Sequence, residues 1–312
     1  MTSRTFGFIL LAAALVAPFV AYPVFLMTAL CFALFTCAFN LLIGYAGLMS
    51  FGHAMFFGIA AYVCGHAIKV WGWPPELALI AGALVAGALG VVTGALAIRR
   101  QGIYFAMITL AFSQMIYFFC LQAPFTGGED GLQGVPRSPM LGGLLPIQND
   151  MVLYYVVLAV FLFGFGAIYR IIHSPFGQVL KAIRENEQRA ISLGYNADRY
   201  KLVAFVLSAT LAGLAGALKA IVMQFATLTD VTAAMSGEVV LMALVGGIGS
   251  IFGPVVGAVV IITMQNYLAA TGEWVLVIQG VIFVAIVLAF RKGIVGEIAD
   301  RWRAFNTRQS KS

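Results

Sequence analysis

Long apolar runs separated by short polar segments extend along most of the sequence. The apolar runs lie near residues 6–22, 24–42, 44–68, 76–98, 102–122, 152–170, 201–223, 236–248, 253–270 and 275–290. Most of them approach the ~20 residues that an α-helix needs to cross the hydrocarbon core of a bilayer. They lack the apolar–polar alternation of membrane β-barrel strands, and unpaired backbone is too costly in hydrocarbon for irregular spans. The pattern predicts an all-α fold, a polytopic transmembrane helical bundle of about ten spans.

The last runs leave the number of spans open. Those near 236–248 and 253–270 are short for full crossings, and "GGIGSIFGP" (246–254) between them favours a break between two helices. The chain after Lys201 therefore fits either four crossings or two crossings with a re-entrant hairpin. The second alternative reduces the expected number of spans to eight.

Composition and charge also place the chain in a membrane. Hydrophobic residues make up 62% of the 312 residues and charged residues 10%, with a mean hydropathy of +0.99. The net charge of +6 does not indicate nucleic acid, because the basic residues cluster beside apolar runs, at 99–100, 170–201 and 291–311. Such clusters mark the cytoplasmic side of membrane proteins. Even numbers of runs separate them, so both termini and the basic tail 291–312 are expected in the cytoplasm.

We expect one transmembrane domain over residues 1–312. The cysteines lie inside apolar runs without CxxC spacing, so neither a disulfide framework nor a metal site is predicted. A P-loop with its Lys and Ser or Thr is absent from the sequence, and the histidines are scattered. The sequence therefore predicts no catalytic residues.

One charged stretch interrupts the apolar pattern, "VLKAIRENEQRAISLGYN" (179–196). Ser174 and Pro175 before it are helix-start residues, and Gly194 is a helix stop. Apolar residues recur from Phe176 to Ile183 at helical spacing, which predicts one short amphipathic helix near 174–194. Such a helix either lies on lipid headgroups or docks to a soluble partner, and composition alone leaves both open.

Several segments together resemble a known family. They are the charged stretch itself, "NLLIGYAGLMSFGHAMFFGIAAYV" (40–63), "QGIYFAMITLAFSQMIYFF" (101–119), "TGGEDGLQGVP" (126–136) and "SGEVVLMALVGGIGSIFGPVVGA" (236–258). In their order along the chain they resemble permease subunits of ATP-binding-cassette importers for branched-chain amino acids, of the LivM type. The resemblance implies a type II importer architecture in the bacterial cytoplasmic (inner) membrane. Its expected partners are a second permease of the LivH type, two ATPase subunits that bind ATP and Mg, and a periplasmic or extracellular binding protein.

The resemblance also assigns roles in the charged stretch, which becomes a coupling helix for the ATPase. Three small or apolar residues are expected to fit a groove in the ATPase, and three charged residues to make polar contacts with it. The first set is Ala182, Ile183 and Ala190, and the second is Arg184, Glu185 and Arg189. Three further residues of the motif complete the expected coupling site, Asn186, Glu187 and Gly194.

Polar residues inside apolar runs are candidates for the translocation path, because they are costly at membrane depth. They are Asn40, Ser50, His53, Thr109, Ser113, Gln114 and Lys219. Hydrogen bonding between helices is the alternative for His53, Ser113 and Gln114. Lys219 either extends its ammonium to the outer interface or faces the path, where it would favour substrates with a carboxylate.

The expected cargo is a branched-chain or related hydrophobic amino acid, with urea or short-chain amides as the alternative within the same kind of permease. A self-sufficient secondary transporter is the rival class. It would need ionisable residues inside the bundle, and the apolar runs offer few besides Lys219 and His53.

Overall fold

The computed structural model describes residues 14–19, 21–143, 145–268, 275–289 and 293–297. Its α-helices are α2 (Pro23–Asn40), α3 (His53–Lys69), α4 (Pro75–Ala97), α5 (Ile103–Gln122), α6 (Asp150–His173), α7 (Pro175–Glu185), α8 (Glu187–Ser192), α9 (Ala197–Met223), α10 (Ala233–Gly246), α11 (Gly253–Leu268) and α12 (Val275–Ala289). The shorter elements are η1 (Ala17–Phe19), the π-helix η2 (Leu41–Ala46), η3 (Pro124–Thr126), η4 (Gly128–Asp130), β1 (Leu132–Gln133), η5 (Leu141–Gly143), β2 (Phe225–Ala226) and η6 (Leu228–Val231).

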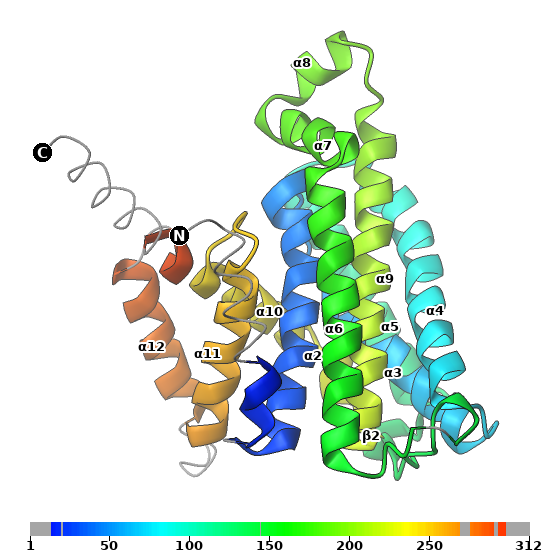
Figure 1. Ribbon diagram of the computed structural model, residues 1–312. Coiled ribbons are helices and arrows are strands. Elements are labelled where there is room, and N and C mark those ends of the chain that lie inside the picture. Colours follow the sequence, from blue (N-terminus) through cyan, green and yellow to red (C-terminus); the bar gives the residue numbers. More distant parts are fainter. Residues whose placement is uncertain (1–13, 20, 144, 269–274, 290–292, 298–312) are drawn as a thin grey trace, which may run out of the picture.

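The long helices form one bundle, and α7 and α8 project from one end of it (Figure 1). Helices α2 and α9 are central: α2 packs against α6, α9 and α11, and α9 also packs against α3 and α4. Fully buried aromatic side chains fill the space between α2, α3 and α9, among them Phe35, Phe57 and Phe205. We call the end that carries α7 and α8 the α7 end, and the opposite end, where β1 pairs antiparallel with β2, the β end.

Five described helical segments are long and apolar enough to span a membrane. They are Pro23–Ala46, Pro75–Ala97, Ile103–Gln122, Asp150–His173 and Ala197–Met223. Shorter apolar helices follow at Ala233–Gly246, Gly253–Leu268 and Val277–Ile286. The chain is therefore a multi-pass helical membrane protein, and most helix bounds lie within a few residues of the apolar runs.

Two expected spans, 24–42 and 44–68, have different bounds in the structure. The first helix continues as the π-helix η2 to Ala46 and ends at Gly47, whose φ of 72° is left-handed. The second, α3, begins only at His53. Hydropathy could not place this boundary, because the irregular segment between the two helices is itself mostly apolar. The expected run 6–22 lies mostly outside the described residues, as does most of the tail 291–312.

Helices α9, α10, α11 and α12 follow the α7–α8 projection along the chain, and α10 packs against α11 and both contact α2. Helix α10 has 14 residues, about 21 Å at the α-helical rise. It is short because the chain does not begin a new helix at the β end: after β2 it turns back into the bundle as η6 and continues into α10. The structure thus has an irregular re-entering segment at 224–232, and among the described helices α9 to α12 only α9 is long enough to span a membrane, so the number of crossings after Lys201 stays a prediction.

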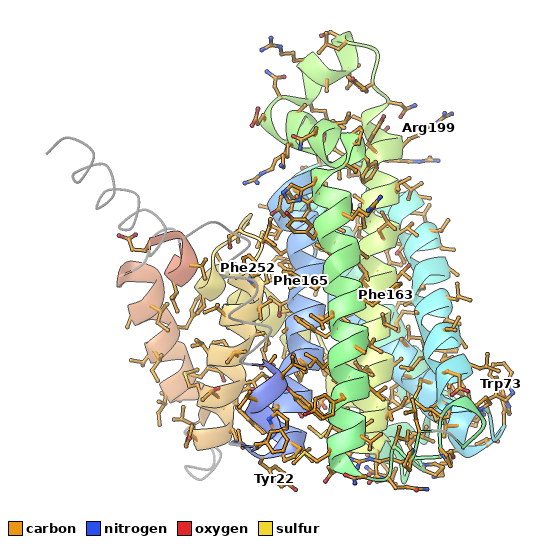
Figure 2. The ribbon with its side chains drawn as sticks, in the orientation of Figure 1. Tyr22, Trp73, Phe163, Phe165, Arg199 and Phe252 are labelled. Carbon is orange, nitrogen blue, oxygen red and sulfur yellow. The ribbon has the colours of Figure 1, made fainter. Side chains whose placement is uncertain are left out.

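The two ends of the bundle differ in composition. Arg199 lies at the α7 end, and Tyr22 and Trp73 lie at the β end (Figure 2). The basic segments 99–100 and 170–201 share the α7 end, since Gln101 donates to Glu187 of α8 at 2.9 Å. The gathering of these basic segments at one end of the bundle is the arrangement that the positive-inside pattern predicts.

Close packing of α9 against α3 predicts opposite effects for two glycine replacements. A Cβ at Gly216 would lie 1.9 Å from the Phe57 carbonyl oxygen, whereas a Cβ at Gly166 in α6 meets nothing within 4 Å. We expect Gly216→Ala to destabilise the protein by about 1–3 kcal/mol through overpacking. Gly166→Ala, the matched control, should stabilise its helix by about 0.5–1 kcal/mol. Denaturant unfolding of the purified chain in detergent measures both, and equal stability of the two variants would contradict the packing.

Candidate functional site

Residues 174–196 form a two-helix projection at the α7 end. The Ser174 hydroxyl caps α7 by accepting from Gly177 N at 3.3 Å, and Pro175 occupies the first turn. Asn186 has extended backbone (φ −155°, ψ 97°) and its side chain accepts from Arg189 N at 3.0 Å. The expected single helix near 174–194 is therefore wrong: Asn186 ends α7 and caps α8, because an Asn side chain satisfies a free helix-start amide well. We call residues 174–196 the α7–α8 segment.

The α7–α8 segment has a small apolar core of its own. Ile183 and Ala190 are 2% and 3% exposed, and they pack with Ala197 at the start of α9. The expectation that these two side chains enter a groove of a partner does not fit the structure, which uses them to join α7, α8 and α9. Of the expected groove residues, Ala182 is exposed.

Charged and apolar side chains share the outer surface of the α7–α8 segment. Glu185, Asn186, Arg189 and Gly194 are exposed there. Sequence reasoning missed three exposed apolar residues next to them: Ile191 is 48% exposed, Leu193 70% and Tyr195 41%. Helical spacing gave no signal for Ile191, because in an unbroken helix it would continue the apolar stripe that ends at Ile183.

Glu187 fastens α8 to the bundle. Its carboxylate accepts from the Lys201 ammonium at 2.5 Å and from Gln101 at 2.9 Å. Lys201 is 3% exposed, so this ion pair is a buried attachment of α8 to α9. Glu187, which the sequence placed in the coupling site, therefore contacts its own chain.

Arg184 fastens α7 to the end of η2. Its guanidinium donates to the Gly44 carbonyl, and its aliphatic stem crosses Gly47, where a Cβ would lie 3.0 Å from Arg184 Cγ. One turn earlier, the Lys181 ammonium lies 5.7 Å from the centre of the Tyr45 ring. Helix α7 thus rests directly on the π-helical end of the central helix.

Asn40 and Tyr45 hold the loop between α10 and α11, residues 247–252. The Asn40 amide accepts from Gly249 N and donates to the Ser250 carbonyl, both at 2.9 Å. The Tyr45 hydroxyl donates to the Gly249 carbonyl at 3.0 Å. The expected path residue Asn40 is 3% exposed and makes bonds to backbone on both sides of its amide. It positions this loop.

The other expected path residues lie at separate places in the bundle. Ser50 caps the segment before α3 by accepting from Gly52 N at 3.2 Å, and Thr109 of α5 accepts from Phe51 N at 3.2 Å. His53 is bonded to Ser208 of α9 at 2.8 Å, which is a contact between helices. Ser113 is fully buried and its hydroxyl has no partner among the described residues.

Gln114 is half-buried on α5. Its side chain makes no hydrogen bond that the structure describes. Among the described residues no group of three or more His, Cys, Asp or Glu side chains is arranged to hold a metal ion.

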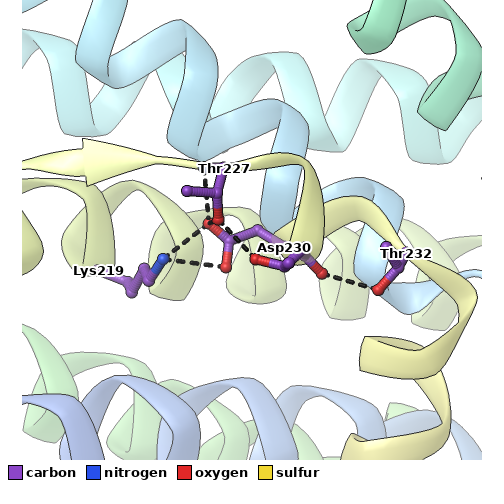
Figure 3. A network of polar contacts seen from close by, with 5 residues as sticks. Lys219, Thr227, Asp230 and Thr232 are labelled. Atoms are coloured by element: carbon purple, nitrogen blue, oxygen red, sulfur yellow. Dashed lines mark hydrogen bonds and ion pairs between the residues drawn. The ribbon is translucent and has the colours of Figure 1, made fainter. Parts of the chain in front are cut away.

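Lys219 forms a buried ion pair with Asp230 (Figure 3). Its ammonium donates to both carboxylate oxygens, at 3.0 and 2.7 Å, and lies 4.5 Å from the centre of the Phe225 ring. The expectation that Lys219 extends to the outer interface is wrong, since the residue is 6% exposed. The re-entering segment 224–232 brings an acid to the lysine, which removes the need to reach water.

Asp230 is also held in place by hydrogen bonds within its own segment, residues 227–230. Its carboxylate accepts from Thr227 N at 3.2 Å and closes a capping box at the start of η6. Sequence reasoning missed Asp230 because it lies in a polar stretch typical of a surface loop, although "TLTD" (227–230) resembles a capping box. It also missed Glu238 of α10, whose carboxylate accepts a hydrogen bond from Gln265 of α11.

An apolar helical bundle with a charged two-helix projection packed on its central helix has the architecture of a polytopic permease of an ATP-binding-cassette transporter. Residues 21–287 match the model of the family described as branched-chain amino acid transport system / permease component, and the chain belongs to this family. No solved structure matches the chain.

Curated relatives agree with the family. The chain is 28% identical over 278 residues to the high-affinity branched-chain amino acid transport system permease protein LivM of Escherichia coli (strain K12), a match that covers 82% of this chain and 65% of the relative. It is 32% identical over 177 residues to the ribose import permease protein RbsC of Bacillus subtilis, covering 53% and 51%. The xylose transport system permease protein XylH of Escherichia coli (strain K12) matches at 24% identity, covering 52% and 43%. The chain thus spans about two-thirds of the LivM protein it matches.

Proposed function

We propose that this chain is a membrane-spanning permease subunit of an ATP-driven, binding-protein-dependent importer in the bacterial inner membrane, with both termini in the cytoplasm. Its proposed partners are a second, LivH-type permease, two ATPase subunits that bind ATP and Mg, and a periplasmic or extracellular binding protein. The basic residues at the α7 end support this orientation. Family membership supports the general class of partners.

The observation that carries the proposal is the α7–α8 segment. Helix α8 lies beyond α7, farther from the bundle (Figure 1), so it stands away from the plane in which a headgroup-bound helix would lie. Its outer surface combines Arg189 with the exposed Ile191 and Leu193. A charged surface around apolar anchors is typical of a protein interface. We propose that the ATPase docks here.

The proposed cargo is a branched-chain or related hydrophobic amino acid. The LivM relatives support it, because their match extends over most of this chain. The relatives named as ribose and xylose permeases match about half of the chain, and they make sugars the comparison substrates in a cargo test. The pairing of Lys219 with Asp230 leaves no free cation at that position to select a substrate carboxylate.

The test is purification of the tagged chain from its own host in mild detergent, followed by reconstitution in liposomes with whatever co-purifies. We expect recovery of an ATPase and a second permease, and ATP-dependent uptake of leucine, isoleucine or valine in the presence of the binding protein. Uptake of ribose or xylose instead would overturn the cargo. Recovery of the chain alone, with transport that needs no ATP, would overturn the importer class and favour a secondary transporter.

A further inference from the structure

Three elements meet at the α7 end: α7, the π-helix η2 and the α10–α11 loop 247–252. We propose that Tyr45, Asn40 and Arg184 form a coupling relay that transmits movement of α7 to this loop, and so to α10 and α11. The proposal rests on the proposed function, in which the ATPase moves α7. It identifies the residues through which that movement enters the bundle.

The first link of the relay joins α7 to η2. Arg184 donates to the Gly44 carbonyl, and that carbonyl belongs to a π-helical turn. In a π-helix a backbone carbonyl accepts from the amide five residues ahead rather than four, and such turns occur often at functional sites. A pull on Arg184 therefore acts directly on the π-helical end of the central helix.

The second link joins η2 to the α10–α11 loop. Asn40 directly precedes the π-helical turn and Tyr45 lies within it, and together they make three hydrogen bonds to the backbone of Gly249 and Ser250. Gly247 and Gly249 give the loop its tight path, since both have positive φ values, 111° and 80°, which glycine adopts readily. Gly44 lets the two elements approach: a Cβ there would lie 2.9 Å from Gly249 N.

Two of the three relay residues, Asn40 and Tyr45, are buried, whereas Arg184 lies at the exposed start of the relay. Asn40 is 3% exposed and Tyr45 5%. The amide oxygen and the amide nitrogen of Asn40 both form hydrogen bonds with the loop 247–252. The loop connects two helices that pack against each other and that both contact α2. A displacement at 247–252 would therefore alter how α10 and α11 pack against the central helix.

Tyr45→Phe is the sharpest test. It keeps the ring beneath Lys181 and removes only the hydroxyl that donates to the Gly249 carbonyl, so no backbone amide loses its acceptor. Tyr154→Phe is the matched control, because Tyr154 is buried and its hydroxyl donates to the Ala14 carbonyl at 2.6 Å, away from the relay. Both variants are studied in the assembled transporter in lipid nanodiscs.

Amide hydrogen exchange with and without a non-hydrolysable ATP analogue gives the first measurement. In the native protein we expect nucleotide to change exchange both in 174–194 and in 247–252. In Tyr45→Phe the change in 174–194 should persist and the change in 247–252 should be lost, while Tyr154→Phe should behave as the native protein. A nucleotide response in 247–252 that survives Tyr45→Phe would overturn the relay.

Transport per ATP hydrolysed gives the second measurement. We expect Tyr45→Phe to lower this ratio by about fivefold, the change in an equilibrium that loss of one net hydrogen bond produces. Arg184→Met, which keeps the stem over Gly47, should lower the ratio as well, and Arg184→Lys, which keeps a donor, should restore most of it. An unchanged ratio in both Tyr45→Phe and Arg184→Met would also overturn the relay. A native transporter in which nucleotide leaves 174–194 unchanged would instead refute the proposed function, and the relay with it.

Discussion

Replacing Asp230 with asparagine is expected to lower the free energy of unfolding by about 3–5 kcal/mol, because it leaves a buried ammonium without its counter-charge. The Lys219 side chain is 7% exposed and that of Asp230 3%, so water cannot substitute for the lost carboxylate. Asparagine has nearly the shape of aspartate and can still accept from Thr227 N, so the loss reports the charge rather than the cap. Denaturant unfolding of the purified chain in detergent measures the change.

Two further variants separate the ion pair from general damage. The double variant Lys219→Met with Asp230→Asn removes both charges and should recover most of the lost stability, as happens when buried pairs are replaced by neutral groups. Asp150→Asn, at a pair whose carboxylate side chain is 41% exposed, should cost about 1 kcal/mol or less. An Asp230→Asn protein as stable as the native one, or a double variant no better than the single, would contradict a buried pair.

The sequence predicted the helices where apolar runs are bounded by polar or helix-breaking residues. The start of α4 at Pro75, after the exposed tryptophans, is an example. The prediction from sequence failed where a helix boundary is fixed by a contact between residues far apart in the sequence. The π-helical end of α2 is fixed by Asn40 reaching a loop more than two hundred residues away, and no local pattern encodes that bond. The boundary at His53 is hidden for a different reason, because the irregular segment before it is itself mostly apolar.

The candidate site was located by its charge, and its details needed the fold. The charged stretch had to lie outside the apolar bundle, and Ser174 and Gly194 bound it as expected. The sequence placed Ile183 on the apolar stripe of one helix, but it could not show that the chain breaks at Asn186 and that Ala190 of α8 then packs with Ile183. Asp230 was missed because a re-entering segment and a surface loop have the same polar composition.

The exposed apolar tip of the α7–α8 segment leads to the second large effect. We expect Leu193→Asp to weaken binding of the ATPase by about 2 kcal/mol or more, roughly 30-fold. The binding energy of an interface is concentrated in a few residues, and a charge introduced at an apolar anchor would be desolvated when the partner binds. Leu193 is 70% exposed and makes no contribution to the buried cluster of Ile183 and Ala190, so the chain itself should fold normally. The measurement is the amount of ATPase that stays bound to the tagged chain as the detergent concentration of the wash is raised.

Two controls decide what a loss of ATPase means. Leu193→Met keeps an apolar side chain of similar volume and should retain the ATPase. Val70→Asp introduces the same charge at an exposed apolar position just after α3, at the β end, and should leave ATPase recovery unchanged. Loss in Leu193→Asp alone would locate the docking surface on α8, since only there does the charge meet a partner. Full recovery of the ATPase with Leu193→Asp would show that the tip faces solvent in the assembled transporter, and docking would then have to rest on the charged residues Glu185 and Arg189 of the α7–α8 segment.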